Sequence, residues 1–592
     1  MSLLDANTED RPSESAPLAR QLAACFERWS LVPEPLLAHV LERLCECIQT
    51  GDTCLLLDST TTEMQGISPR EAVERLEATG LAGPPEVDRP LVLDSESRLY
   101  LRQEWRLGNR LAHALVARLA QNPQKPDDEP QATVNGAGSE NPEFRRMSML
   151  AGSAPLSLIS GGPGTGKTTG LIRFLRAQLA RCPETLERLA LCAPTGKAAA
   201  RLREGLSRSD DFSEAVRHAL VERVGTVHRL LRPFGPARRF RHHSENLLPV
   251  DLLVVDEASM LDNHLLTHLL EATPSAARIV LLGDPDQLAS VETGAAFGEL
   301  VRAAADIESD ALRSRYLDTK KVDTLKRGLA NRSVRLTRNY RFACQPGIAG
   351  LCEAIRQGDA DQALGILRDS SLEDAQLRSL TTPNPLADEA FRAAVLRSVQ
   401  PLLEAGNVNE ALARLPDSQV LCVLRRGSYG VGGVQRQLMR LLGHALSASA
   451  LPNGMPVTLL RNSSRLGRAN GDVGVAWTDG SQTAVWFAEG DGAPVGLSLS
   501  SLPEWTPGPA LTVHRSQGSE YGRVHVLLPP DDHPLLTREL IYTAVSRART
   551  AVTLWGSEPA LRCAIERPTR RQSGLLAQMQ ALWDTRETTP LA

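Results

Sequence analysis

Several features are scarce or missing in this chain, and each absence narrows what it can be. Aromatic residues make up only 4% of the 592 residues, and the formal net charge is −4. No global positive field therefore points to nucleic acid, so any such site must be a local groove. The ten cysteines are scattered and form no Cys-x-x-Cys pair, which favours reduced thiols over a zinc or iron–sulfur site.

Long apolar runs are also missing. No stretch reaches the roughly 18 residues that a membrane span needs. Residues 1–10 are polar and acidic, unlike a signal peptide. We therefore expect a soluble cytoplasmic protein. A chain of 592 residues is too long for one hydrophobic core, so three or four domains are expected.

What the chain does contain is a glycine-rich stretch between a predicted strand, 156–159, and a predicted helix, 171–176. In such a turn glycines let backbone N–H groups face an anion, and the helix N-terminus adds partial positive charge. Lys167 would reach the β- and γ-phosphates, and the Thr168 hydroxyl would hold Mg²⁺. A plain turn would not explain why Lys and Thr follow. The predicted nucleotide-binding residues are Gly161, Gly162, Pro163, Gly164, Thr165, Gly166, Lys167, Thr168 and Thr169.

Two further predicted strands end in polar residues suited to hydrolysis. Asp256 and Glu257 follow the apolar run 252–255, and Gln287 follows the run 279–282. Asp256 can hold Mg²⁺ through Thr168 and water, and Glu257 can polarise the attacking water. The Gln287 amide can sense a γ-phosphate. The alternatives are helix capping by the two carboxylates and a tight turn at Gln287.

The remaining pattern divides the chain into domains. Residues 1–120 show helical spacing and predict a packing or docking domain, and the proline-, glycine- and acid-rich residues 121–146 indicate a linker. Two α/β domains are predicted at 147–334 and 335–592. Within the second, short β-type runs separated by Asn-Gly-Asp and Asp-Gly-Ser turns predict a small antiparallel barrel at about 453–508.

Three candidate sites keep two interpretations each. Thr195 and Lys197 follow the strand 189–192, where they could hold a nucleic-acid phosphate or simply begin a helix. The basic loop 232–248 could be a solvated face or an inserted hairpin touching DNA. Arg547, at the end of a predicted helix, could be a surface residue or an arginine finger for a nucleotide on the first domain.

In their order along the chain, these motifs resemble those of superfamily 1 helicases. They lie at 161–168, 193–197, 256–257, 283–288, 340–341, 512–518 and 542–549. The residues within these motifs resemble more closely still those of the RecD family, the α subunits of exodeoxyribonuclease V (the RecBCD complex). This resemblance covers about residues 150–570, with a weaker match before them.

The resemblance implies an α/β fold of two RecA-like motor domains, with a small 1B insertion at 232–248 and an SH3-like 2B insertion at about 453–508. It implies a 5′→3′ ATP-dependent DNA motor that uses ATP and Mg²⁺. Such a motor works with RecB and RecC on single-stranded DNA and DNA ends at double-strand breaks, in homologous recombination. It also implies that residues 1–120 dock on RecC and that the nuclease lies in RecB.

The resemblance assigns further roles residue by residue. Arg341 and Arg547 would reach ATP from the second domain. The implied strand contacts are Thr195, Thr226, His228, Thr512, His514 and Ser516.

Two departures and two rival functions accompany the resemblance. Residues 143–150 lack the glutamine that usually reads adenine in this family, and the acidic linker is longer than expected. One rival is a stand-alone RecD-like helicase acting without RecB and RecC. The other is a nucleotide-dependent regulatory subunit that unwinds nothing.

Overall fold

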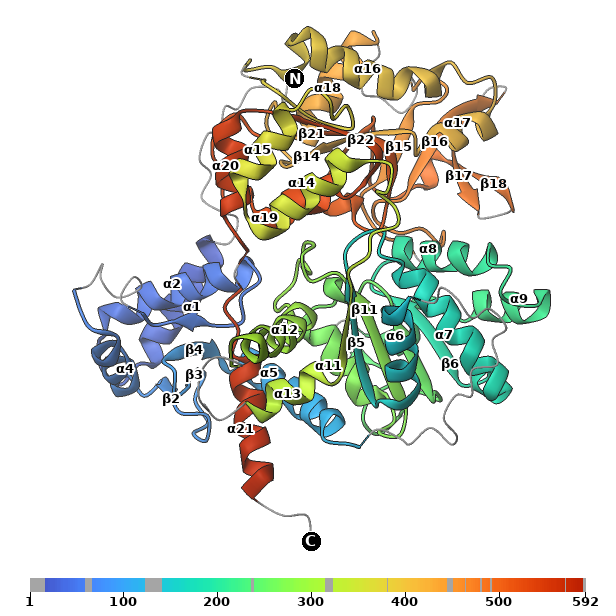
Figure 1. Ribbon diagram of the computed structural model, residues 1–592. Helices are drawn as coiled ribbons and strands as arrows, with labels where there is room; N and C mark the ends of the chain where they lie inside the picture. The colour runs from blue at the N-terminus through green and yellow to red at the C-terminus, as the bar shows by residue number, and fades with distance from the viewer. Residues whose placement is uncertain are drawn as a thin grey trace.

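The computed structural model describes residues 16–58, 66–122, 141–235, 239–314, 323–380, 382–443, 451–463, 465–479, 482–489, 492–569 and 571–588. Figure 1 shows one α/β domain above another, with an N-terminal unit beside the lower one. Within the described ranges, every helix is too short or too polar to cross a membrane.

The N-terminal unit is mixed α/β, and the prediction of a helical domain at 1–120 was wrong in this respect. Its helices are α1 (Ala16–Trp29), α2 (Pro35–Gln49), α4 (Pro69–Ala78) and α5 (Arg102–Leu119). Beside them lies a sheet of order β1-β4-β3-β2, formed by β1 (Leu55–Leu56), β2 (Ala82–Gly83), β3 (Leu91–Leu93) and β4 (Arg98–Leu101). Strands this short show no alternating pattern in a sequence. Tyr100, which falls in the range predicted to be helical, lies buried in β4.

The first motor domain is built on a six-stranded parallel sheet of order β12-β5-β11-β10-β6-β7. Its strands are β5 (Leu156–Gly161), β6 (Leu189–Ala193), β7 (Val224–Thr226), β10 (Leu252–Val255), β11 (Arg278–Gly283) and β12 (Ser333–Leu336). All residues of β5 and β10 are buried, because helices cover both faces of the sheet. Since β5, β11 and β10 are neighbours, the turns after them meet at one edge.

The helices of this domain are α6 (Pro142–Ser153), α7 (Lys167–Arg181), α8 (Gly196–Ser207), α9 (Glu214–Glu222), α10 (Val227–Leu231), α11 (Asn263–Ala272), α12 (Ala296–Ser314) and α13 (Thr324–Ala330). Two predicted domain boundaries differ from those in the structure. Residues 141–146, assigned to the linker, begin α6, where the Asn141 side chain accepts from the Glu143 N–H ahead of a first-turn proline. The rest of that linker, 123–140, lies outside the described residues. The strand β12 spans the predicted 334/335 boundary, so the first domain extends to Leu336.

The 232–248 insertion contains a hairpin. Strand β8 (Pro233–Phe234) pairs antiparallel with β9 (Arg239–Phe240), and residues 236–238 between them are outside the described ranges. The hairpin itself is confirmed, while its contact with DNA stays a prediction.

The second motor domain has a five-stranded parallel sheet of order β13-β22-β21-β14-β20. Its strands are β13 (Ala375–Arg378), β14 (Ser418–Cys422), β20 (Ala510–Thr512), β21 (Tyr521–Leu527) and β22 (Ala548–Trp555). Its helices are α14 (Pro346–Gln357), α15 (Ala360–Arg368), α16 (Glu389–Leu403), α17 (Val408–Arg414), α18 (Val431–Leu441), α19 (Arg538–Val545) and α20 (Glu558–Glu566).

The predicted insertion in this domain is an antiparallel sheet of order β18-β17-β16-β15-β19. Its strands are β15 (Pro456–Leu459), β16 (Val473–Asp479), β17 (Gln482–Glu489), β18 (Gly492–Ser498) and β19 (Trp505–Pro507). The predicted antiparallel strands are confirmed. Closure into an SH3-like barrel stays a prediction.

The C-terminal helix α21 (Leu575–Thr588) leaves the second domain, to which the range 335–592 had assigned it. Leu575 and Met579 join the hydrophobic core shared by α5 and the first domain, and the Trp583 Nε1–H donates to Thr324 Oγ1 over 3.0 Å. Figure 1 shows α21 descending beside α5, α12 and α13. The prediction was wrong because the sequence of a helix does not reveal which of two cores it joins.

Candidate nucleotide site between the two motor domains

The glycine-rich loop lies between β5 and α7, as the sequence predicted. Gly164 and Gly166 have φ of +75° and +84°, which L side chains rarely adopt. Space is equally restrictive, because a Cβ on Gly161 would lie 2.5 Å from Thr165 Oγ1 and one on Gly164 would lie 2.3 Å from Arg341 Cβ. The glycines are therefore required by both conformation and packing.

Lys167 opens α7 and turns back over this loop. Its ammonium donates to the Gly161 carbonyl and, over 3.2 Å, to the Gly162 carbonyl. Burial raises the pKa of Asp256 and of Asp284, and the positive charge of Lys167 opposes that rise. Thr168 follows in the first turn of α7, half-buried. The ammonium is thus placed where loop carbonyls and two carboxylates converge.

Asp256 and Glu257 stand at the carboxyl end of β10. Asp256 is only 9% exposed, and burial together with the Glu257 charge raises its pKa to about 6. Its Oδ1 accepts from the Glu257 N–H over 2.9 Å. Glu257 has φ +54°, a strained conformation for a residue with a side chain. A buried carboxylate beside a second one is an environment that a divalent cation would stabilise, so the donor set fits Mg²⁺.

Gln287 joins the two motor domains. Its Nε2 donates to Asp284 Oδ2 over 2.9 Å, and its Oε1 accepts from Arg547 Nη2 over 3.0 Å. Arg547 is 2% exposed and also donates to the Thr543 and Ser519 carbonyls. The surface alternative for Arg547 is therefore wrong, and the arginine lies at the predicted sensor.

Arg341 and Arg547 come to the same place from different parts of the chain. Arg341 Nη2 donates to Glu520 Oε1 over 2.6 Å, and Arg201 of the first domain also pairs with Glu520. Burial, with Arg201 and Arg547 nearby, lowers the pKa of Arg341 to about 9. Sequence reasoning missed Arg201 and Glu520, although both lie within or next to motifs it had marked.

An aromatic pair includes one residue of the segment 143–150, which lacks the glutamine expected in this family. The rings of Phe144 and Tyr340 stack with centroids 6.3 Å apart and planes 19° apart. Tyr340 N–H donates to the Gly164 carbonyl over 2.8 Å, and Asn141 Nδ2 donates to the Tyr340 hydroxyl over 3.0 Å. Helix α6 is therefore linked to the glycine-rich loop by Phe144, which stacks on Tyr340, and by Tyr340, which bonds to Gly164.

The predicted strand-contacting residues are mostly engaged inside the protein. Thr195 and Thr226 cap α8 and α10 by accepting from Ala198 N–H and Arg229 N–H over 3.2 Å each. The capping interpretation of Thr195 is thus confirmed. Lys197 Nζ donates to the Arg515 carbonyl across the domain boundary over 3.3 Å, and burial lowers its pKa to about 8.

The other members of this set lie near the same boundary or further along the first domain. Thr512 and Ser516 are buried, with Ser516 Oγ donating to the Val513 carbonyl over 2.7 Å. His514 is half-buried, and its burial lowers its pKa. The His228 ring lies 6.1 Å from that of Phe240 in the hairpin.

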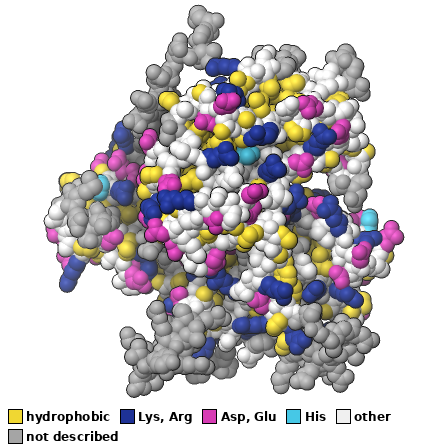
Figure 2. All heavy atoms as spheres, turned by 45° about the horizontal axis from the view of Figure 1, so that its top comes forward, with side chains coloured by type: hydrophobic (Ala, Val, Ile, Leu, Met, Phe, Trp, Pro, Cys, Tyr) yellow, Lys and Arg dark blue, Asp and Glu magenta, His cyan; other side chains and the backbone are white. Residues whose placement is uncertain are grey.

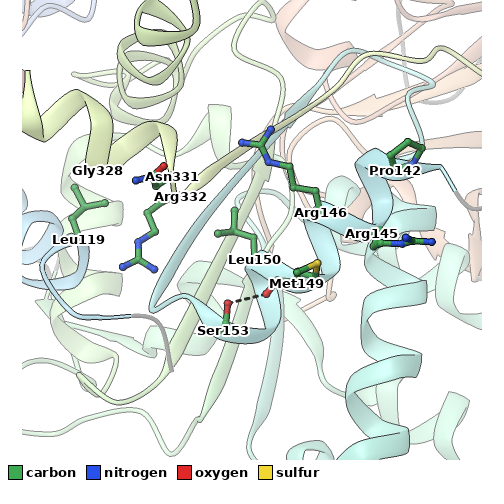
Figure 3. Close-up of a pocket in the computed structure, with 10 residues that line it drawn as sticks. All are labelled: Leu119, Pro142, Arg145, Arg146, Met149, Leu150, Ser153, Gly328, Asn331 and Arg332. Atoms are coloured by element: carbon green, nitrogen blue, oxygen red, sulfur yellow. Dashed lines mark hydrogen bonds between the residues drawn. The ribbon is translucent and has the colours of Figure 1, made fainter. Parts of the chain in front are cut away.

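The surface charge adds little to the description of the nucleotide site, because basic and acidic side chains are interspersed over the face shown in Figure 2. A cavity of about 580 Å³ lies away from the nucleotide loop, between α6 and the α13 end of the domain, as Figure 3 shows. Its lining includes Arg145, Arg146 and Met149 of α6.

A phosphate loop, an acidic pair, a sensor amide and arginines from a second α/β domain together define a two-domain P-loop ATPase of the helicase type. Comparison with known proteins agrees. Residues 147–293 match a family described as an AAA domain, and residues 507–555 match a UvrD-like helicase C-terminal domain.

Individual relatives narrow the class. The chain is 34% identical to the RecBCD enzyme subunit RecD of Mycolicibacterium smegmatis, over 98% of this chain and 99% of that one. It is 32% identical to the ATP-dependent RecD2 DNA helicase of Deinococcus radiodurans, over 82% of this chain and 59% of that one. A solved structure of a Bacteroides Pif1 helicase with ADP-AlF3 and ssDNA is 17% identical, with a TM-score of 0.40 over 76% of this chain and 98% of that one.

The chain belongs to the RecD family and is an ATP-dependent DNA helicase. The rival interpretation as a regulatory subunit that unwinds nothing is thereby set aside.

Proposed function

We propose that this chain is the 5′→3′ motor subunit of a cytoplasmic RecBCD-type helicase–nuclease that unwinds DNA ends in double-strand break repair. The observation that carries the motor part is the hydrogen bond from Arg547 to Gln287. It joins the second domain to the sensor of the first, so events at the γ-phosphate can change how the two domains sit against each other.

The phosphate loop and α7 would bind ATP between the domains. Loop N–H groups and the α7 N-terminus would face the phosphates, and Lys167 would exchange its two loop carbonyls for phosphate oxygens. Mg²⁺, held by Thr168 and through water by Asp256, would neutralise phosphate charge. Glu257, beside Asp256 on its strained turn, would orient and polarise the attacking water.

The two arginines supply the inter-domain half of the site. Arg341 and Arg547 would stabilise charge on the transferred phosphoryl group, as arginine fingers do. They reach this position only while the second domain rests on the first. Binding therefore closes the site, and loss of the γ-phosphate removes the anion that both arginines share.

Movement along DNA requires that each domain hold the strand. The proposed contacts are Thr195, Lys197, Thr226 and His228 on the first domain and Thr512, His514 and Ser516 on the second. Lys197 already touches the 512–516 turn through the Arg515 carbonyl. Opening and closing of the site would therefore change the spacing between the two sets of contacts.

Partners are proposed from the family. RecB- and RecC-type subunits would complete the complex, with the N-terminal unit docked on RecC, the nuclease in RecB and the inserted sheet, as an SH3-like module, beside the DNA. The likeness to RecD2 favours one alternative, a helicase that acts alone. Co-purification of the chain with RecB- and RecC-type proteins from its own cells decides between them.

The test of the site is Lys167→Gln in the full chain. We expect DNA-stimulated ATP hydrolysis to fall below detection while affinity for single-stranded DNA stays within about twofold, since the proposed partner of Lys167 is the nucleotide and not the DNA. Undiminished hydrolysis would refute the assignment. Strand displacement on duplexes with a 5′ or a 3′ tail measures the polarity, and preference for the 3′ tail contradicts the proposed direction.

A further inference from the structure

The chain between α20 and α21 crosses from the second motor domain to the first. Figure 1 shows this segment running down from α20 toward α21, past the N-terminal unit. The described part of the crossing consists of residues 567–569 and 571–574, and the Arg571 side chain makes four hydrogen bonds to the first domain. The mechanism above gives this residue no role.

Arg571 binds one turn of the first domain. Its Nη1 donates to the Glu292 carbonyl over 2.9 Å, to the Gly294 carbonyl over 2.6 Å and to Ser290 Oγ over 3.3 Å. Its Nη2 donates to the Ser290 carbonyl. The guanidinium therefore reaches three residues of the turn 290–294, within which the Ser290 hydroxyl also donates to the Glu292 and Gly294 carbonyls. The turn lies a few residues beyond Gln287 on the same loop.

The other end of this loop is held by the second domain. Leu288 N–H donates to Thr543 Oγ1 over 2.9 Å, and Gln517 Nε2 donates to the Leu288 carbonyl over 2.8 Å. Gln287 itself bonds to Arg547. The second domain thus holds this loop at 287–288 and Arg571 holds it at 290–294, so loss of Arg571 would remove one of the attachments that keep the sensor in place.

The N-terminal unit takes part in the same set of contacts, so Arg571, the turn 290–294 and residues 51–52 are together called the joint. Gly51 has φ +96°, and a Cβ built on it would lie 2.6 to 2.8 Å from three atoms of the Arg571 guanidinium. Gly294 N–H donates to the Gly51 carbonyl over 2.9 Å, and Gln572 N–H donates to Asp52 Oδ1 over 2.7 Å. Only glycine leaves room here for the arginine.

The joint is a poor source of stability alone. Burial lowers the pKa of Arg571 and raises that of Asp52 and of Glu299, which lie close enough to interact with it. Arg571 Nε and Glu299 Oε1 are buried without a hydrogen-bond partner among the described residues. Burial of polar groups of this kind costs free energy that apolar packing would not. The buried polar groups of the joint therefore fit a role in fixing its geometry.

We propose that Arg571 is a positioning residue for ATP hydrolysis, which holds the 290–294 turn so that Gln287 stays on Arg547, and that Gly51 makes the N-terminal unit part of this joint. The proposal rests on the proposed role of Gln287. It follows that a protein docked on the N-terminal unit can alter hydrolysis through residues 51–53, without touching the nucleotide.

The test uses Arg571→Ala, Arg571→Lys, Gly51→Ala and the double variant in the full chain. For Arg571→Ala we expect kcat for DNA-stimulated ATP hydrolysis to fall about 10- to 100-fold, as for a misplaced group, with KM for ATP and affinity for single-stranded DNA within about twofold. Lysine should restore part of kcat. Gly51→Ala should show the same kcat loss, and kcat of the double variant should be no lower than that of Arg571→Ala because the clash no longer has its target. The left-handed strain at residue 51 should lower the stability of both Gly51 variants.

Arg567→Ala is the matched control. Arg567 lies on the same crossing but binds Asp532 and carbonyls of the second domain only, so its kcat should equal that of the wild type. Unchanged kcat in folded Arg571→Ala overturns the proposal. If that variant fails to fold, full kcat in folded Arg571→Lys together with folded Gly51→Ala overturns it instead.

Gln287→Ala separates this inference from the proposed site. Normal hydrolysis by that variant refutes the sensor and, with it, the route from Arg571. Slow hydrolysis by Gln287→Ala alongside normal hydrolysis by Arg571→Ala refutes the joint alone.

Discussion

Removal of the Asp256 charge should raise stability and abolish activity, two changes in opposite directions. Burial and the neighbouring Glu257 charge raise its pKa from 3.8 to about 6. The folded chain therefore binds this proton more tightly than the unfolded chain. Its contribution to the free energy of unfolding is fully present below about pH 3.8 and is lost as pH rises through about 6. A difference of about two pKa units corresponds to about 3 kcal/mol at most.

Asp256→Asn removes the charge but keeps an oxygen that can accept from the Glu257 N–H. We therefore expect this variant to be more stable than the wild type at pH 8, by up to about 3 kcal/mol, and equal to it near pH 4. Hydrolysis should be lost, because an amide is a weak ligand for Mg²⁺. The assay is urea unfolding of the full chain at pH 4 to 8, without nucleotide and with divalent cations chelated.

Asp286→Asn serves as the control for this prediction. Burial and the Asp284 charge raise the pKa of Asp286 to about 6 as well, so its removal should flatten the pH dependence of stability in the same direction. Asp286 has no proposed part in hydrolysis. An Asp256→Asn variant that is less stable than the wild type at pH 8 would show that the buried charge is already compensated, and would refute the reasoning.

Three further variants test other parts of the site. Arg547→Lys keeps the charge but cannot reach the Gln287, Thr543 and Ser519 oxygens together, so kcat should fall about 10³-fold or more; a steady-state ATPase assay with a loss under tenfold contradicts this. Gly164→Ala, at φ +75° and against Arg341 Cβ, should weaken ATP binding at least tenfold, and titration with a fluorescent ATP analogue checks it. Phe144→Ala should cost about 3 to 5 kcal/mol of stability in urea unfolding, and a cost below 1 kcal/mol would show that the stack on Tyr340 is dispensable.

The central strands β5, β6 and β10 of the first parallel sheet could be predicted from the sequence because they are fully buried and each ends in a motif. The runs 156–159 and 252–255 are continuous apolar segments, and the sheet buries both of their faces. The short strands β2 and β3 have no such pattern. The return of α21 to the first domain could not be predicted either, since it depends on which of two cores offers a complementary surface.

The same contrast holds within the site. Lys167, Asp256 and Gln287 are local features of a strand end, and their motifs identify them. Glu520 and Arg201 are recognisable only once two domains meet, because their partners lie far away in the chain. The Phe144–Tyr340 stack is a similar case. Arg571 and Gly51 are 520 positions apart, and no local pattern marks either residue.

The cations of the site already have partners inside the protein, and this affects how a nucleotide can act. Lys167 bonds to loop carbonyls, Arg547 to Gln287, and Arg341 shares Glu520 with Arg201. A nucleotide phosphate would have to replace the loop carbonyls on Lys167 and Glu520 on Arg341, so only part of the attraction between ATP and these cations would appear as affinity. Glu520 pairs with Arg201 of the first domain and with Arg341, the arginine proposed to bind the γ-phosphate. Loss of that phosphate would return Arg341 to Glu520, so the proposed cycle would not leave Arg341 as a buried, uncompensated positive charge.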